Sequence, residues 1–494
     1  MDRNQNLQRI RDRQTPWDIV VIGGGATGVG CALDAASRGL DVLLLEQHDF
    51  GKGTSSRSTK LVHGGVRYLA QGDLRLVREA LSERSTLLKN APHVVHTQEF
   101  VIPCYSLWQK AFYGFGLKIY DLLAGNKRIG RSRILSRSET IERLPQVKTD
   151  GLSGGILYHD GQFDDARLLI DMALTGDGLG ACLVNYAPVL DFLNDDLGRI
   201  NGVKFTDVET GEVHKVLSRT ILNATGAFCD PLRMKAAPNA KPVVTFAQGS
   251  HIVLDRRFMS SDAVLMIPKT SDGRVLFCIP WHEHVIVGTT DIPVESAVLE
   301  PEARDAEIDF ILETVGGYLT ETPKRADILS VFAGIRPLVS RAGTKNTAAL
   351  SRSHELFVDA DVVVTITGGK WTTYRKMAEK AVDRAVEIAG FDAGPCVTAG
   401  FEISGPPKSN GERIHKDFQY TDDDVVQAVR DEMARTVEDV LARRTRTLFL
   451  NSAAAIDMAP QVAEIMAQEL GKDSEWCEVE IDAFTKIASA YTTN

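Results

Sequence analysis

Hydrophobic residues near the start of the chain follow the pattern of a strand, a helix and a second strand. Residues 17–22 (WDIVVI) form a short apolar run rich in β-branched residues, which is typical of a parallel strand buried on both faces. Residues 26–38 place small and apolar residues at helical spacing and stop at Gly39, a residue suited to a left-handed helix terminus. Residues 41–45 (DVLLL) complete the pattern as the second strand. The sequence therefore predicts a βαβ unit here.

Two other regions show different patterns. Between residues 243 and 291, short runs with alternating or β-branched character follow one another (VVTFAQGSHIVL, AVLMIP, RVLFCIPW and HVIVGTTD), which predicts a mostly antiparallel sheet. Residues 404–411, rich in Gly, Pro and Ser, are typical of a linker. After it Thr421 is a candidate helix cap, and apolar residues on one helical face predict a helical domain. These apolar residues are Val425, Val429, Met433, Val437 and Val440.

Composition narrows the class of protein. At 494 residues, of which 44% are hydrophobic and 25% charged, the chain is long enough for two or three domains and lacks the polar bias of disorder. The formal net charge of −10 disfavours a nucleic-acid partner. Seven scattered cysteines without paired ligand spacing indicate reduced thiols in the cytoplasm and no metal site. The polar N-terminus has no signal-peptide core, and no apolar run is long enough to span a bilayer.

Three glycines stand between the first strand and the helix. Gly23, Gly25 and Gly28 form G-x-G-x-x-G, in which the first permits a tight turn, the second lets the backbone approach a pyrophosphate, and the third lets the helix lie against the sheet. Ala26 and Thr27 open the helix, whose N-terminal N–H groups and partial positive charge can hold an anion. This order of elements predicts dinucleotide binding. The alternative is a plain turn whose glycines serve packing only.

Glu46 ends the second strand, eighteen residues after Gly28. An acid that binds the ribose belongs at this place in a dinucleotide-binding unit. The alternative is a solvated charge at a strand end.

Residues 54–69 read TSSRSTKLVHGGVRYL, and this stretch resembles the FAD-dependent glycerol-3-phosphate dehydrogenases. Other segments that resemble this family follow in family order, so the resemblance covers most of the chain, including the helical tail. They are residues 223–226 (NATG), 288–291 (GTTD), 334–338 (GIRPL), 368–375 (GGKWTTYR) and 429–450. Each short segment taken singly is typical of a strand followed by a turn, so the resemblance depends on all of them occurring together.

The resemblance implies an α/β fold in three parts. A Rossmann-like FAD-binding domain would contain the βαβ unit, a mostly antiparallel β domain would pack over the flavin on the substrate side, and a helical domain would follow, in a D-amino-acid-oxidase-like architecture. The expected ranges are 17–105 with 150–240 and 325–395 for the discontinuous FAD-binding domain, 106–149 and 241–324 for the substrate or cap domain, and 405–494 for the C-terminal helical domain.

The resemblance also implies which residues hold FAD. Ser56, Ser58 and Thr59 would meet the flavin with hydroxyls, and Gly64 and Gly65 with backbone, because glycine permits close approach. The other expected FAD contacts are Gly23, Gly25, Ala26, Thr27, Gly28, Glu46, Thr54, Ser55, Leu61, His63, Ala224, Thr225, Gly226, Gly334, Arg336, Gly369, Lys370, Trp371 and Thr372.

Glycerol 3-phosphate carries a dianionic phosphate and a secondary alcohol at C2. Its oxidation needs fixed cations, a proton acceptor, and hydride transfer to flavin N5. Arginine suits the phosphate because its planar guanidinium bonds in bidentate fashion and stays protonated. The alternative for any single Arg or Lys is a surface charge with its stem on apolar surface. The substrate contacts that the motif match implies are Arg67, Tyr68, Arg336, Arg352, Lys370 and Thr372.

Four of these residues are the catalytic candidates. Lys370 would stabilise negative charge near N1 of the reduced flavin, and Arg336 would bind the substrate beside it. His63 and His251 titrate in the range that a proton acceptor needs. Each has a structural alternative, His63 as a neutral ring bonded to FAD and His251 as a satisfied histidine of the core. The sequence leaves the base unassigned.

Residues 107–133 combine aromatic residues with Lys and Arg, which suits a helix lying in a membrane interface. This region bears on the electron acceptor. A quinone lives in the bilayer and dehydrogenases of the resembling family are peripheral membrane proteins, whereas its oxidases use dioxygen. The alternative is that the aromatic residues belong to the core. They are Trp108, Phe112, Phe115 and Tyr120.

The function predicted on this basis is oxidation of sn-glycerol 3-phosphate to dihydroxyacetone phosphate by hydride transfer to FAD. Electrons would pass to a quinone, and the protein would be cytoplasmic, at the inner face of the cell membrane. The alternatives are a glycerol-3-phosphate oxidase using dioxygen, an amine or amino-acid oxidase on the same fold, an NAD-dependent dehydrogenase and a non-catalytic flavin-binding redox scaffold. The sequence leaves open whether the protein forms a homodimer. In the tail, Arg443, Arg444 and Arg446 either bind an anionic partner or form a solvated helix face.

Overall fold

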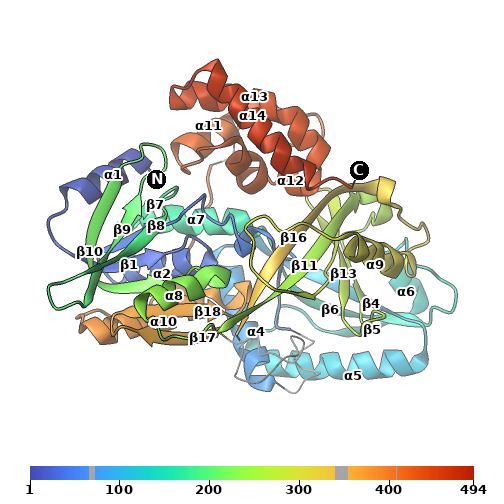
Figure 1. Ribbon diagram of the computed structural model, residues 1–494. Coiled ribbons are helices and arrows are strands. Elements are labelled where there is room, and N and C mark those ends of the chain that lie inside the picture. Colours follow the sequence, from blue (N-terminus) through green and yellow to red (C-terminus); the bar gives the residue numbers. More distant parts are fainter. Residues whose placement is uncertain (66–72, 340–353, 408, 494) are drawn as a thin grey trace.

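The computed structural model describes residues 1–65, 73–339, 354–407 and 409–493. Within these ranges the strands form two large sheets that lie side by side, and helices of the C-terminal segment cover the top of both (Figure 1). The expected α/β fold with a helical C-terminal domain is confirmed. In the described part of the chain, the helices are too short or too polar to cross a bilayer.

The first sheet is built around the strand predicted at residues 17–22, whose Ile19, Val20 and Val21 are fully buried. This strand pairs in parallel with its neighbours on both sides, as expected for a βαβ unit. The predicted helix and second strand also form where the pattern places them. In spatial order the strands are β17 (His354–Asp359), β18 (Val363–Gly368), β10 (Val213–Asn223), β1 (Trp17–Ile22), β2 (Val42–Leu45) and β7 (Cys182–Val184), with β9 (Ile200–Thr206) and β8 (Val189–Asn194) extending from β10.

Helices cover both faces of this sheet. Small residues let α2 pack closely, and its alanines at 32 and 35 are completely buried. The helices around the sheet are α1 (Arg3–Asp12), α2 (Ala26–Ser37), α7 (Asp165–Gly178), α8 (Cys229–Ala236) and α10 (Tyr374–Ala389).

The second sheet confirms the mostly antiparallel prediction, with one parallel pair between β12 and β4. Its strands are, in spatial order, β15 (Ile292–Val294), β11 (Val244–Asp255), β14 (His284–Gly288), β13 (Leu276–Trp281), β12 (Val264–Ile267), β4 (Val95–Cys104), β6 (Gly154–Phe163) and β3 (Leu61–Val62), with β16 (Ile328–Val339) beside β11 and β5 (Arg133–Leu135) beside β6. The strands β3, β4, β6 and β16 lie in ranges expected for the FAD-binding domain, yet they pair in this sheet. The domain boundaries stay a prediction.

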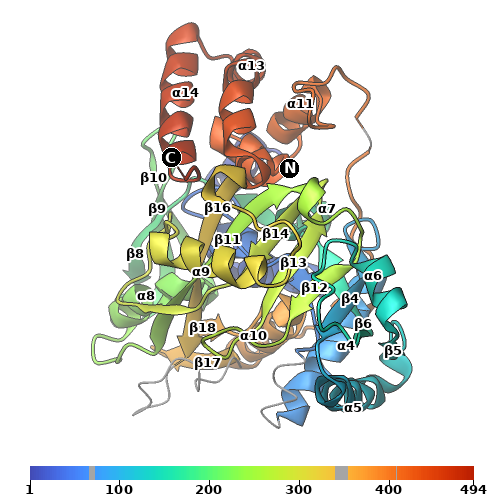
Figure 2. The same cartoon turned by 90° about the vertical axis from the view of Figure 1, so that its right-hand side faces the viewer.

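Helix α5 (Leu107–Ala124) lies along the edge of the molecule opposite the C-terminal helices (Figures 1 and 2). Trp108 is 75% exposed and Phe115 71% exposed, and Phe112 is also exposed, whereas Tyr120 is buried. The interpretation of these aromatic residues as core is therefore wrong for three of the four. The other helices beside the second sheet are α4 (Leu74–Asn90), α6 (Arg137–Arg143) and α9 (Asp305–Gly316).

The C-terminal domain is helical, but its first helix is shorter than the pattern predicts. Thr421 caps α11 in a capping box with Asp424. The helix ends at Arg430, and Met433 adopts a left-handed φ of 56°. The carboxylate of Asp439 then accepts hydrogen bonds from two backbone N–H groups ahead of it, which starts a new turn. The helices are α11 (Asp422–Arg430), the π-helical turn η9 (Asp439–Arg444), α12 (Thr447–Leu450), α13 (Ser452–Leu470) and α14 (Ser474–Ser489).

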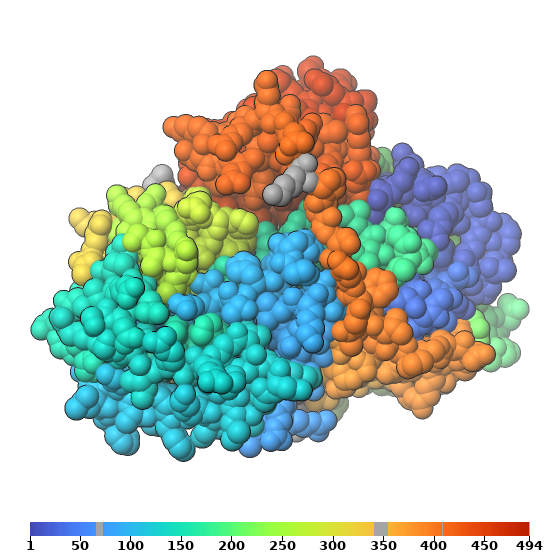
Figure 3. All heavy atoms as spheres, turned by 180° about the vertical axis from the view of Figure 1, so that it is seen from behind, coloured from blue at the N-terminus to red at the C-terminus, as the bar shows by residue number. Residues whose placement is uncertain are grey.

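The connection between α10 and this domain runs over the back of the molecule, where Figure 3 shows it as an orange path. It is fastened to the body by Asn90, whose side-chain amide donates to Thr398 O at 2.8 Å and whose carbonyl accepts from Ile403 N at 2.7 Å. Residues 404–411, predicted as a linker, contain neither helix nor strand among their described members.

The arginines of the tail are buried, so both predictions for them are wrong. Arg443 is 2% exposed, Arg444 is 7% and Arg446 is 0%. Their guanidinium groups pair with acidic side chains of other parts of the chain instead of facing water or an external partner.

Candidate active site

Two adjoining cavities lie where the sheets meet. The first, of about 410 Å³, is lined by the glycine turn, Glu46, residues 51–55 and residues 224–226. The second, of about 270 Å³, is lined by residues that include Thr59, His251 and Arg336. The two cavities share wall residues and so lie directly beside each other. The shared residues are Thr54, Pro337, Gly369, Lys370 and Trp371.

The glycine turn is closely packed against its own surroundings on one side and faces the first cavity on the other. Gly23 has a φ of 107°, and a Cβ there would meet Ala224 O at 2.8 Å. A Cβ on Gly28 would lie 1.8 Å from Gly23 O, so Gly28 serves the close packing of α2 on the turn. The N-cap of α2 is Gly25, which has no side chain to satisfy the helix N–H groups, and Gly25, Ala26 and Thr27 line the first cavity.

Glu46 faces the first cavity and is held by two backbone donors. Its Oε2 accepts from Gly24 N at 2.6 Å, and its Oε1 accepts from His48 N at 2.9 Å. Burial raises the pKa of this carboxyl, and the two hydrogen bonds oppose the rise. Glu46 is thus fixed at the cavity wall and is not a solvated charge at a strand end.

Arg336, on β16, is held by the GTTD turn after β14. Its Nη2 donates to Thr289 Oγ1 at 3.0 Å, and its Nη1 donates to Thr290 O at 3.1 Å and to Asp291 Oδ1 at 3.3 Å. Because the guanidinium is oriented by three acceptors and lines the second cavity, it is a preorganised cation and not a surface charge.

His251, on β11, is fully buried in the wall of the second cavity. Its Nε2 is 3.0 Å from Thr59 Oγ1, and its ring stacks on Phe332 with centroids 4.6 Å apart. Burial, with Arg336 and Lys60 adding to it, lowers the pKa of His251 well below its usual range. The imidazole is therefore neutral at pH 7. Its Nδ1 has no hydrogen-bond partner among the residues that the structure describes.

The GGKW loop joins the two cavities. Gly368 and Gly369 both have positive φ, which turns the chain so that Lys370 lines both cavities. Trp371 Nε1 donates to Ser55 O at 2.8 Å, and Thr372 Oγ1 accepts from His63 N at 3.2 Å. These bonds tie the loop to the TSSRSTKLVHG segment, as expected if both segments surround one flavin.

Most of the predicted site residues reach a cavity wall. Three do not: Gly28 packs inside its turn, Ser56 is buried with its carbonyl bonded to Lys60 and Arg446, and a Cβ on Gly64 would strike the Tyr120 hydroxyl. Three further predictions, Arg67, Tyr68 and Arg352, lie outside the described residues. The residues that do line a cavity are Gly23, Gly25, Ala26, Thr27, Glu46, Thr54, Ser55, Ser58, Thr59, Leu61, His63, Gly65, Ala224, Thr225, Gly226, His251, Gly334, Arg336, Gly369, Lys370, Trp371 and Thr372.

Sequence reasoning missed several wall residues. Gly51, Lys52 and Gly53 line the first cavity, and their position between Glu46 and the TSSRSTKL segment was a usable signal. Tyr158 and Phe277 line the second cavity, but nothing in their sequence surroundings distinguishes them from ordinary core residues of a strand.

Comparison with known families agrees with this geometry. The family described as "FAD dependent oxidoreductase" matches residues 18–375, and that described as "C-terminal domain of alpha-glycerophosphate oxidase" matches residues 373–477. The fold and the two-part cavity therefore define an FAD-dependent oxidoreductase, and the FAD prediction is confirmed. The NAD-dependent alternative is disfavoured.

Individual relatives narrow the family. "Probable glycerol-3-phosphate dehydrogenase, mitochondrial" of Caenorhabditis elegans is 39% identical, covering 93% of this chain and 71% of its own. The mitochondrial glycerol-3-phosphate dehydrogenase of Mesocricetus auratus is 37% identical, covering 96% and 73%. The crystal structure of the glycerol-3-phosphate dehydrogenase from Bacillus halodurans, complexed with FAD, superposes with a TM-score of 0.78 at 26% identity, covering 99% of this chain and 97% of that one. The chain belongs to the glycerol-3-phosphate dehydrogenase family.

Proposed function

We propose that the protein oxidises sn-glycerol 3-phosphate to dihydroxyacetone phosphate in the second cavity. The observation that carries this proposal is the preorganised Arg336, which lies with Lys370 in the wall of a cavity that adjoins the first one. A fixed guanidinium and an ammonium suit the substrate phosphate and the charge that develops during oxidation. FAD, when bound in the first cavity, supplies the acceptor for the hydride from C2.

The residues of the chain divide the remaining work. Arg336 binds and orients the substrate, with Thr289 and Asp291 holding the guanidinium in place. Lys370 lines both cavities and would offset the negative charge that a flavin bound there gains on reduction. Neutral His251 accepts the hydroxyl proton, and the hydrogen bond to Thr59 orients its ring. Thr372 fixes the backbone beside His63 and so holds the cavity wall.

The test is to mix the purified protein with glycerol 3-phosphate under nitrogen. We expect the flavin absorbance at about 450 nm to bleach rapidly, with one dihydroxyacetone phosphate formed for each flavin reduced. Arg336→Lys should keep the flavin and lose most of the bleaching rate, because a compact ammonium lacks the planar fork with which the guanidinium can bind a phosphate in bidentate fashion. A flavin that an amino acid bleaches and glycerol 3-phosphate leaves unchanged would support the amino-acid oxidase alternative.

We also propose that electrons pass to a membrane quinone and that α5 contacts the lipid. The exposed side of this helix gathers large apolar side chains of a kind that soluble surfaces seldom group together, with Lys118 within the same helix and Lys127 and Arg128 just after it. On this proposal the protein works in the cytoplasm, at the inner face of the cell membrane. The exposed apolar residues are Leu107, Trp108, Phe112, Phe115 and Leu122.

A further inference from the structure

The loop of residues 49–60, which leads from β2 to β3, forms part of both cavity walls. Residues 51–55 line the first cavity, and Ser58 and Thr59 line the second. Its only regular structure is a single 3-10 turn, η1 (Thr54–Ser56), within the described chain. The conformation of the loop therefore depends on its hydrogen bonds and ion pairs with other segments of the chain.

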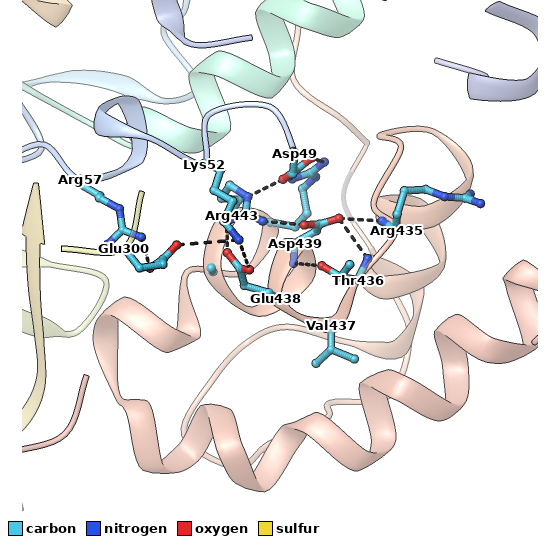
Figure 4. A network of polar contacts seen from close by, with 12 residues as sticks. Asp49, Lys52, Arg57, Glu300, Arg435, Thr436, Val437, Glu438, Asp439 and Arg443 are labelled. Carbon is cyan, nitrogen blue, oxygen red and sulfur yellow. Dashed lines mark hydrogen bonds and ion pairs between the residues drawn. The ribbon is translucent and has the colours of Figure 1, made fainter. Parts of the chain in front are cut away.

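One anchor is Asp49, at the start of this loop. Arg444 donates to both carboxylate oxygens at 2.7 and 2.9 Å, and Arg443 Nε donates to the same carboxylate. Arg443 also pairs with Glu438 at 2.7 Å and with Asp439 at 2.6 Å (Figure 4). Burial alone raises the pKa of Asp49, but the two guanidinium groups outweigh it and bring the pKa to about 2. The anchor is therefore ionised at physiological pH.

A second anchor holds the middle of the loop. Lys52 Nζ pairs with Glu438 at 2.5 Å. Arg57 donates to Glu300 at 2.5 Å and to the hydroxyl of Tyr491 at 2.7 Å. The contacts of Lys52 with Glu438 and of Arg57 with Tyr491 reach the C-terminal domain, to which Glu438 and Tyr491 belong. Figure 4 shows the Lys52, Glu438 and Arg57 contacts on one side of the network.

A third anchor fixes the end of the loop. Arg446 is completely buried, and its Nη2 donates to Ser56 O and to Asp165 Oδ1, each at 2.9 Å. Lys60 Nζ donates to the same two residues, to Ser56 O at 2.8 Å and to Asp165 Oδ2 at 2.7 Å. Ser58 also donates to Asp165, through its hydroxyl at 2.6 Å. A single arginine of the C-terminal domain is thus built into the flavin-side end of the loop.

The anchors lie within a few residues of groups that line the cavities. Ser55 Oγ accepts from Ala26 N at 2.9 Å, in the glycine turn, and Ser55 O accepts from Trp371. Buried ion pairs are a poor means of stabilising a domain contact, because the desolvation of the charges offsets much of their attraction. Apolar side chains at the same positions would stabilise the contact between the domains at least equally. Buried charges with several fixed acceptors instead impose one geometry on the loop, and that geometry is what a cofactor cradle requires.

We propose that Arg443, Arg444 and Arg446 are positioning residues that clamp the 49–60 loop, so that the C-terminal domain sets how tightly FAD is retained. They act through Asp49, Ser56 and Asp165 and are not among the residues that line either cavity. The inference concerns FAD retention and holds whatever substrate is oxidised.

The test compares Arg444→Gln with Arg435→Gln in the holoenzyme. Arg435 is a matched control, because it lies nearby in the same domain and pairs with Glu209 at 2.6 and 2.7 Å, away from the loop. FAD release is followed without substrate by the rise of flavin fluorescence after dilution, and unfolding is followed separately by circular dichroism. We expect Arg444→Gln to release FAD at least about tenfold faster at temperatures far below unfolding. Arg435→Gln should release it at the wild-type rate.

Two further readouts separate positioning from general stability. Activity lost in Arg444→Gln should return when excess FAD is added, since the chemistry itself is intact. Should Arg444→Gln fail to fold, Glu438→Gln keeps the side-chain shape, weakens the contacts to Lys52 and Arg443, lies outside both cavity walls, and should also speed FAD release. Wild-type FAD release from a folded Arg444→Gln or Glu438→Gln protein, or release that occurs only together with unfolding, would overturn the proposal.

Discussion

The guanidinium of Arg336 lies directly over Gly249 of the neighbouring strand, where a Cβ would come within 2.1 Å of Nη2. Gly249→Ala should therefore push Arg336 off its three acceptors while leaving the cofactor cavity unchanged. We expect kcat/KM for glycerol 3-phosphate to fall by about 100-fold, as is typical when a binding group is misplaced by about 1 Å. Bound flavin, measured from the visible spectrum, should stay at the wild-type level.

The matched control for this change is Gly178→Ala, because a Cβ at Gly178 meets nothing within 4 Å. It should leave kcat/KM unaltered. Unchanged kinetics in Gly249→Ala would mean that Arg336 does not bind the reacting substrate.

Gly28→Ala should affect the cofactor instead of the substrate. Its Cβ would lie 1.8 Å from Gly23 O, so α2 must move away from the turn that Gly23 and Gly25 form. Overpacking of this kind costs about 1–3 kcal/mol, which corresponds to FAD binding weaker by about 5-fold to 150-fold if the strain falls on the glycine turn. The ratio of flavin to protein absorbance after gel filtration measures the loss. Full flavin occupancy would show that the turn tolerates a methyl group and that the geometric argument for FAD there is wrong.

The lowered pKa of His251 predicts how the free energy of unfolding changes with pH. The unfolded imidazole binds a proton below about pH 6.5, whereas the folded one, held neutral by burial, does not. The unfolded state thus binds more protons in this range, so stability falls as the pH drops below about 6.5, by at most about 1.4 kcal/mol per pH unit from this residue. Unfolding midpoints at about pH 7.5 and pH 5.5 should therefore differ more for the wild type than for His251→Gln.

Other buried histidines contribute equally to the pH dependence of the wild type and of His251→Gln. Burial also lowers the pKa of His48, His159, His284 and His354, and these residues are present in both proteins. Equal pH dependence in the two proteins would mean that His251 carries a proton in the folded state.

The parts of the fold predicted from sequence are those whose signals are local. The strand at 17–22, the glycine turn and the helix after it depend on residues a few positions apart, and the structure forms them almost at the predicted bounds. The arginine cluster could not be predicted in this way. Arg446 meets Ser56 across 390 positions and Asp165 across 281, so its burial depends on how the domains meet and not on its own helix pattern.

The same limit explains the helix after Thr421. Spacing alone placed Met433 and Val440 on one continuous helix, and both are buried as expected. The helix nevertheless ends at Arg430, and a new turn begins where Asp439 accepts hydrogen bonds from the N–H groups of Arg435 and Thr436. A periodic apolar pattern predicts which residues face a core, but it does not exclude a polar side chain that competes for the backbone.

The exposed face of α5 predicts lipid binding that depends on a few side chains. Replacing Trp108, Phe112 and Phe115 together by serine removes exposed aromatic area, so helix packing, which uses Tyr120 and Leu117, should be unaffected. We expect binding to vesicles that contain anionic lipid to weaken by on the order of tenfold or more in a flotation assay, with reduction of a soluble quinone analogue unchanged. A control that replaces Leu197 and Val479 by serine removes apolar residues that are also exposed but lie outside α5, and it should bind vesicles like the wild type. If the α5 variant floats with vesicles as well as the control does, the membrane contact lies elsewhere on the molecule, and the proposal for α5 is wrong.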